Sequence, residues 1–271
     1  MTDSQAPVGE FSLSEARTIV GEFFRPNPWI YWIDFLLSWS IGLSAFGLVQ
    51  APEFVTSDTA WHWPIRIVAF FVSSILYYRC ALFIHELVHI SDKEFKAFRF
   101  VWNMLCGIPF LIPSFVYYIH LDHHRRKHYG TKHDGEYISL AHMPASKIVW
   151  YMLGVLAVPP LAVLRFGVLT PLTWISRPVR DWVHQHASSM IMNPMYLRPM
   201  PTPRVLRIIR WQELFCFLWI LFIAVRMFYP LGLIPGTLSP MFLVQIYLTG
   251  VFIIFLNNLR TLGAHRWIST G

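Results

Sequence analysis

Histidines at metal-ligand spacing form two clusters in the first half of the sequence. The first is His85-Glu-Leu-Val-His89, whose i, i+4 spacing puts both imidazoles on one face of a helix. The second is His120-Leu-Asp-His123-His124, whose spacing likewise places three imidazoles on one face. Packed together without a metal, such rings would repel when charged or leave polar nitrogens unpaired when neutral. Because imidazole suits iron, zinc, copper and nickel, each cluster predicts part of a metal site.

One further histidine near the end of the sequence joins this set. It lies in Arg260-Thr-Leu-Gly-Ala-His265-Arg266, which we expect on the same side of the molecule as the two clusters. Six imidazoles are too many for one tetrahedral zinc and indicate two metals that share one site. The candidate ligands are His85, His89, His120, His123, His124 and His265, with His128 as a secondary candidate. We expect His184 and His186 to lie on the surface instead.

The amino-acid composition indicates the class of protein in which these histidines occur. Of the 271 residues, 55% are hydrophobic and only 14% are charged, whereas a soluble domain carries about 25% charged residues. Mean hydropathy is +0.46. These values exclude soluble, disordered and fibrous classes and predict a polytopic membrane protein. The three scattered cysteines, Cys80, Cys106 and Cys216, are expected to be buried thiols rather than a disulfide framework or a zinc site.

Long apolar blocks set the expected architecture, because a spanning helix needs roughly 20 mostly apolar residues. Four blocks qualify: Trp29–Val49, Trp63–Ile84, Trp211–Tyr229 and Leu238–Leu256. Two further blocks contain prolines that interrupt a regular helix, and we predict re-entrant or interfacial segments there: Val101–Ile119 and Ile148–Ile175. The expected fold is all-α, with four transmembrane helices and a cytoplasmic cap of interfacial helices from residues 85–210. It forms a single membrane domain over residues 1–271.

The distribution of basic residues predicts how the chain is oriented across the membrane. Fifteen of the 22 Lys and Arg residues lie between His85 and Arg210, and none lies in the connectors 50–62 and 230–237. Because loops rich in Lys and Arg stay in the cytoplasm, we expect an integral, multi-pass protein with both termini and all histidine clusters on the cytoplasmic side. The net charge of +7 is explained in the same way, so no nucleic-acid partner is expected.

The two histidine clusters, in this order, resemble the first two histidine boxes of the membrane fatty acid desaturase superfamily. The resemblance covers most of the chain. It is supported by the segment that follows the second cluster, Tyr129-Gly-Thr-Lys-His-Asp134-Gly-Glu136-Tyr137. It implies a non-haem enzyme with two iron ions that uses O₂ and two electrons to introduce a double bond into an acyl chain. The implied partners are a lipid or acyl-CoA substrate and a separate electron donor of ferredoxin, rubredoxin or cytochrome b5 type.

The chain departs from the family pattern at its end. The family carries a third box, His-x-x-His-His, after the last helix, and this sequence stops at Gly271 without one. We therefore expect a C-terminally incomplete sequence that is inactive as it stands. Acidic residues beside the clusters are candidates to orient the imidazoles: Glu86, Asp122, Asp134 and Glu136. For the last two, a solvated loop position is an equal alternative.

Three other functions fit part of the pattern. A related di-iron enzyme that hydroxylates an alkyl chain or lipid would use the same residues. An intramembrane zinc metalloprotease would use His85-Glu86-x-x-His89 with Glu86 as general base, but leaves the second cluster unexplained. A membrane transporter for metals would keep polar groups at the bilayer midplane, where these blocks carry few.

Two expectations concern the substrate and the electron donor. We expect an apolar tunnel between the cap and the helix ends, with aromatic candidates for its lining: Trp102, Phe110, Phe115 and Tyr118. The basic run Arg125, Arg126 and Lys127 is expected either to dock an acidic electron carrier or to lie at the membrane surface.

Overall fold

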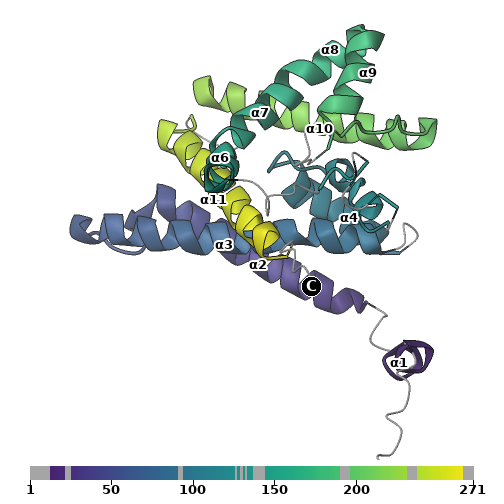
Figure 1. Ribbon diagram of the computed structural model, residues 1–271. Helices are drawn as coiled ribbons and strands as arrows, with labels where there is room; N and C mark the ends of the chain where they lie inside the picture. The colour runs from purple at the N-terminus through teal and green to yellow at the C-terminus, as the bar shows by residue number, and fades with distance from the viewer. Residues whose placement is uncertain are drawn as a thin grey trace, which may run out of the picture.

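A computed structural model describes residues 13–21, 26–90, 94–125, 127–128, 131, 133–136, 144–189, 196–230 and 237–264. Every regular element in these ranges is helical, so the expected all-α class is confirmed there (Figure 1). The α-helices are α1 (Leu13–Ile19), α2 (Pro28–Gln50), α3 (His62–His89), α4 (Lys96–Trp102), α5 (His120–His123), α6 (Ala145–Leu153), α7 (Val158–Leu164), α8 (Thr170–Ile175), α9 (Arg177–His186), α10 (Pro203–Phe228) and α11 (Pro240–Ala264).

Within the described ranges, five helical segments are long and apolar enough to cross a membrane. They are Pro28–Gln50, Thr59–His89, Val158–Ile175, Pro203–Phe228 and Pro240–Gly263. Four of them contain most of each block predicted to span. Val158–Ile175 is additional and lies in a region that we expected to be re-entrant or interfacial, so the structure offers one candidate more than the predicted four.

The positions of the prolines in Val158–Ile175 explain why this segment is helical although we expected its helix to be interrupted. Pro159 and Pro160 lie in the first turn of α7, the part of a helix where proline is best tolerated, and Pro171 lies at the start of α8. The two helices are joined by a π-helical turn, η8 (Arg165–Leu169), rather than by a break. The segment around Val101–Ile119, in contrast, contains only short elements, which agrees with the predicted interruption of a regular helix; its re-entrant or interfacial position stays a prediction.

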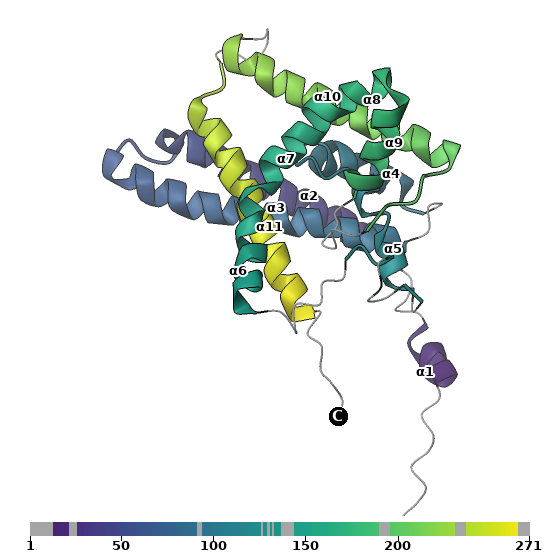
Figure 2. The same ribbon diagram turned by 45° about the horizontal axis from the view of Figure 1, so that its top comes forward.

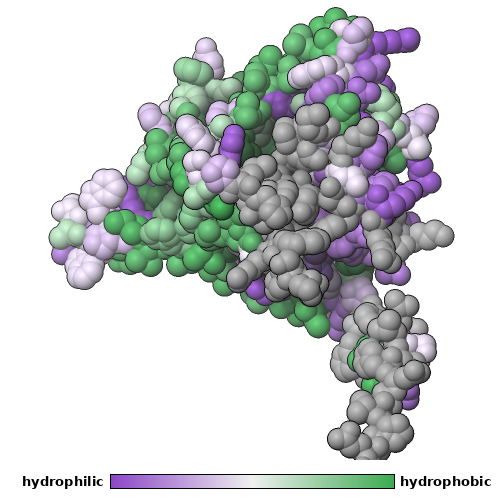
Figure 3. All heavy atoms as spheres, viewed as in Figure 1, coloured by the Kyte–Doolittle hydropathy of each residue, from purple (hydrophilic) through white to green (hydrophobic). Residues whose placement is uncertain are grey.

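The apolar side chains of the long helices face outward. Only 22% of the most apolar window of α10 and 11% of that of α11 are buried inside the protein. Figure 3 shows hydrophobic residues spread over a broad part of the visible face. Such surfaces need a lipid environment, because an exposed apolar patch of this extent is unfavourable in water. The cytoplasmic orientation itself stays a prediction.

The packed core lies beside the second half of α3, which ends in the first histidine cluster. Phe35 of α2, Phe83 of α3 and Phe98 of α4 pack edge to face. The Trp102 indole N–H donates to the carbonyl of Cys80 at 2.8 Å and ties α4 to α3. The helix α4 and the turn after it are therefore fixed next to the histidine end of α3.

The three cysteines are buried and free, as expected from their scattered positions: Cys80, Cys106 and Cys216.

The helices α2 and α3 form an extensively packed pair, and α11 crosses α3 (Figure 1). A bidentate ion pair, with Arg79 donating to Asp34 at 2.6 and 2.7 Å, joins α2 to α3.

Candidate metal centre

Four imidazoles from the two clusters converge at the C-terminal end of α3. One ring nitrogen from each of His85, His89, His120 and His124 lies within 4.8 Å of the other three. Ring centroids are 4.6 Å apart for His85 and His120 and 4.8 Å apart for His89 and His124. Figure 2 shows α5 beside this end of α3. The i, i+4 pair of each cluster does converge as predicted, whereas His123, the third ring expected on the same face, is not one of the four.

Short local elements bring the second cluster to the first. The helix α3 runs without a break from His62 to His89, so both histidines of the first cluster lie on its last two turns. A 3₁₀ turn, η5 (Ser114–Tyr117), leads directly into the single turn of α5. The His120 ring is buried, whereas His89 and His124 are exposed. The site is therefore a cluster with one open side rather than a closed core.

Two buried carboxylates orient two of the histidines. The Nδ1 atom of His120 donates to Glu136 Oε2 at 2.8 Å, and Nδ1 of His123 donates to both oxygens of Asp134 at 2.9 Å. Asp134 is fully buried and Glu136 is 7% exposed. Of the two alternatives for these acids, the structure therefore supports orientation of the imidazoles and not a solvated loop position. A neutral ring that donates from Nδ1 presents a lone pair at Nε2.

The other two acidic candidates behave differently. Glu86 is exposed and contacts His85 Nδ1 at 3.3 Å. Asp122 pairs with Arg125 on the surface at 3.0 Å. Only the buried pair Asp134 and Glu136 can therefore hold a ligand imidazole in a dry, fixed setting.

The donor chemistry of the cluster fits a transition metal. The Nε2 atoms of His120 and His124 are only 2.9 Å apart. Partial loss of hydration lowers the pKa of His124, although its side chain keeps one open side, and the nearby ring of His120 lowers the pKa further. Both effects favour the neutral form of His124, whose free lone pair a first-row transition metal binds well. Four imidazole nitrogens within one small space are a chemically suitable ligand set for iron.

The remaining candidate ligands have different places. His123 lies beside the four, with its ring 5.9 Å from that of His120 and 5.6 Å from that of His124. His128 is not one of the four, and its ring lies 5.9 Å from that of His133. His265 lies outside the described residues. The structure therefore brings together four of the six predicted ligands and places a fifth next to them.

The expected surface position of His184 is wrong, whereas that of His186 is confirmed. His184 is only 1% exposed on α9, because this face of α9 packs into the protein. Neither of its ring nitrogens has a hydrogen-bond partner among the described residues. Burial lowers the pKa of His184, the carboxylate of Glu213 opposes this shift, and the guanidinium of Arg165 adds to it. The His186 ring is exposed and contacts the carbonyl of Trp182 at 2.9 Å.

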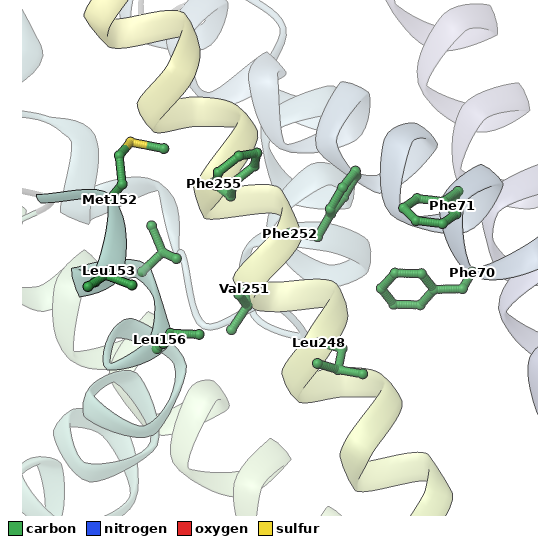
Figure 4. A pocket seen from close by; sticks show the side chains of 10 residues that line it. Phe70, Phe71, Met152, Leu153, Leu156, Leu248, Val251, Phe252 and Phe255 are labelled. Carbon is green, nitrogen blue, oxygen red and sulfur yellow. The ribbon is translucent and has the colours of Figure 1, made fainter. Parts of the chain in front are cut away.

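The aromatic residues proposed to line a tunnel belong mostly to the core. Trp102 and Phe115 are fully buried and packed on their neighbours. An apolar groove of about 450 Å³ lies elsewhere, between α3, α11 and the end of α6 with the turn η7 (Gly154–Leu156) (Figure 4). Its lining is entirely apolar: Phe70, Phe71, Met152, Leu153, Val155, Leu156, Leu248, Val251, Phe252 and Phe255. In the sequence, these residues could not be distinguished from ordinary lipid-facing positions.

A helical membrane protein with clustered imidazoles at the end of a long apolar helix has the features of a membrane-bound metalloenzyme. The chain belongs to the fatty acid desaturase family, which matches residues 61–269. This confirms the family that the two histidine boxes resemble. The chain is also similar to a ceramide hydroxylase of Caulobacter vibrioides, with 31% identity over 268 residues, 95% of this chain and 69% of that protein. No solved structure matches it significantly.

Proposed function

We propose that this protein uses O₂ to oxidise an acyl chain of a membrane lipid at a histidine-bound di-iron centre. The observation that carries the proposal is the convergence of four imidazoles in a chain of the fatty acid desaturase family. His85, His89, His120 and His124 would hold the metal, with His123 and His265 as the further proposed ligands. Bound iron would supply the oxidising power to break an unactivated C–H bond, which no side chain provides.

The chain's own residues prepare this chemistry. The carboxylate of Glu136 holds the His120 ring so that Nε2 points away from the acid. The Tyr117 ring stacks on His120 at 4.6 Å and limits its rotation from one side. Burial raises the pKa of Tyr117, so its phenol stays protonated and neutral beside the cluster. These contacts would keep the ligand set ordered before substrate arrives.

Hydroxylation is our first proposal for the outcome, and desaturation is the second. The relative from Caulobacter vibrioides is a ceramide hydroxylase, which favours a ceramide-like lipid and insertion of one oxygen. Hydroxylation would consume O₂, two electrons and two protons, and would form an alcohol and water. Desaturation would consume the same reagents and form an alkene and two waters. A separate electron donor would supply the electrons in either reaction.

The product distinguishes these outcomes. We expect full-length protein with ferrous iron, O₂ and a reducing system to add one oxygen atom to a ceramide, measured by mass spectrometry. Loss of two hydrogens would indicate desaturation. His120→Ala should abolish the product, whereas the surface variant His186→Ala should retain it. Absence of both products on every acyl lipid tested, or bound zinc with proteolytic activity, would contradict the proposal.

We further propose that the apolar groove receives the acyl chain. Phe71 lies 14 residues before His85 on α3, which corresponds to about 21 Å along a helix, so only a long chain would reach the groove from the metal centre. Val251→Trp should fill the groove and shift product formation toward shorter chains. Leu243→Trp, at an exposed position of α11 outside the groove, should leave the chain-length profile unchanged. An unchanged profile in Val251→Trp would contradict this assignment.

A further inference from the structure

The main chain of Phe115, just before the second histidine box, is held on both its N–H and its carbonyl by buried side chains from distant parts of the sequence. The Phe115 N–H donates to Gln212 Oε1 of α10 at 3.2 Å. The Phe115 carbonyl accepts from Arg198 Nη2, also at 3.2 Å. Phe115 is five residues before His120, and both groups that hold it are at most 9% exposed. The position of this turn is thus set from outside its own segment.

The neighbouring residue, Ser114, is held in the same way. Its N–H donates to Asn103 Oδ1 at 2.9 Å, and its Oγ accepts from Asn103 Nδ2 at 3.1 Å. The Gln212 amide also contacts Ser114 Oγ, at 3.1 and 3.3 Å. We call Asn103, Ser114, Arg198 and Gln212 the clamp. Its side chains are all at least nine-tenths buried.

The clamp is itself fixed to the rest of the protein by a buried ion pair. Arg198 donates to the carbonyl of Ser188, and Arg165 donates to the Oγ of the same residue at 2.9 Å. Arg165 also pairs with Glu213 of α10. Two arginines thus meet at Ser188, just after α9, and link α9 and α10 to the turn at Phe115.

The path from the clamp to the metal centre is short and rigid. The turn η5 contains Ser114 and Phe115 and ends at Tyr117, whose ring is stacked on His120. Only two residues, Tyr118 and Ile119, separate this turn from the second histidine box. A movement of the Phe115 peptide would therefore move the stacked tyrosine and the start of α5 with it. Among the described residues, no clamp side chain hydrogen-bonds to a histidine, so the clamp acts through the turn.

We propose that Gln212 and Arg198 are positioning residues that set where His120 and His124 lie relative to the histidines of α3. This inference rests on the proposed function of the cluster as a metal centre. Supporting groups one step removed from a metal ligand commonly change metal affinity about 10- to 100-fold when altered. The clamp extends that role to a second tier, which holds backbone rather than imidazole.

The test is metal binding, which requires neither substrate nor an electron donor. Full-length, metal-free protein is titrated with Co²⁺, and the visible ligand-field spectrum reports affinity and the arrangement of nitrogen ligands. Gln212→Met keeps the side-chain length but removes both amide functions. We expect about a tenfold or greater loss of Co²⁺ affinity and an altered spectrum. Gln212→Glu retains the oxygen that accepts from Phe115 and should restore much of the affinity.

Gln245→Met is the matched control. Gln245 is a buried amide of α11 that donates to the Phe46 carbonyl at 3.0 Å, far along the chain from either histidine box. It should bind Co²⁺ as the unaltered protein does. Circular dichroism and size-exclusion chromatography establish that each variant is folded.

Each result has a definite meaning. Failure of the unaltered protein to bind Co²⁺ would overturn the proposed metal centre, whereas unchanged affinity and spectrum in folded Gln212→Met would overturn the clamp alone. An equal loss in Gln245→Met would also overturn it. If Gln212→Met does not fold, Ser114→Ala removes the Oγ contacts at the cost of one atom. It should weaken binding several-fold, and an unchanged titration would count against the clamp.

Discussion

The substitution Glu136→Gln tests how much the negative charge of the buried carboxylate strengthens His120 as a metal ligand. The amide oxygen of Gln can still accept from His120 Nδ1, so the geometry survives while the charge is lost. The pair is buried, with side chains 5% and 9% exposed, so water screens it little. A hydrogen bond to a charged group contributes about 1.5–3 kcal/mol and a neutral one about 0.5–1.5 kcal/mol. The midpoints of these ranges differ by about 1.3 kcal/mol, which corresponds to a loss of metal affinity of nearly tenfold.

The assay is competition for Fe²⁺ or Co²⁺ between the protein and a chelator of known affinity. Asp122→Asn is the control, because Asp122 lies in the same histidine box but pairs with exposed Arg125. It should bind metal as the unaltered protein does. Equal affinity in Glu136→Gln and the unaltered protein, or an equal loss in Asp122→Asn, would refute the reasoning that the buried carboxylate strengthens His120 as a ligand.

Three further predictions concern stability, each measured by thermal unfolding in detergent. Gly107→Ala places a methyl group 2.9 Å from two buried side chains and should cost about 1–3 kcal/mol, whereas Gly154→Ala meets no atom within 4 Å and should be tolerated. Glu213→Gln leaves the Arg165 charge buried without its partner and should cost about 3–5 kcal/mol; a double variant with apolar residues at both positions should recover most of it. The pKa of His184 is lowered from 6.5 by burial, so below this pH the unfolded chain binds a proton that the folded chain does not. Stability should therefore fall as pH decreases from about 6.5, by up to about 1.4 kcal/mol per pH unit, and His184→Phe should remove this component.

The histidine pairs could be predicted because helix periodicity alone decides which side chains share a face. His85 and His89 are four residues apart on α3, and His120 and His124 are four apart across α5 and its end. The approach of one pair to the other was inferred from the number of imidazoles and from their expected place on one side of the membrane, and the family resemblance supported it. Their actual contact depends on the turn before α5, which no local spacing describes.

The clamp could not be predicted, since its hydrogen bonds join residues far apart in the sequence. Ser114 and Gln212 are separated by 98 positions, and Gln212 lies at the edge of a block that we expected to begin at Trp211. The helix α10 begins earlier, at Pro203, which places Gln212 and Glu213 inside it. A single polar residue within an apolar helix gives no indication of which distant backbone group it meets.

Two predictions were wrong because they relied on residue type alone: a helix break at prolines and a surface position for a histidine. The prolines of Val158–Ile175 were expected to break a helix, but their places in first turns make them compatible with one. His184 was expected on the surface because its neighbours are polar, yet it lies on the buried face of amphipathic α9. In both cases the position within the helix, rather than the residue type, decided the outcome.

The central claim is that the two histidine boxes hold iron together. Iron X-ray absorption spectroscopy on full-length protein, purified without chelators and reconstituted with ferrous iron, tests it most directly. We predict a first shell dominated by nitrogen, with the outer scattering of several imidazoles, and a marked loss of both in His85→Ala and in His120→Ala. Iron that fails to bind, or that binds with an unchanged spectrum in either variant, would contradict the claim.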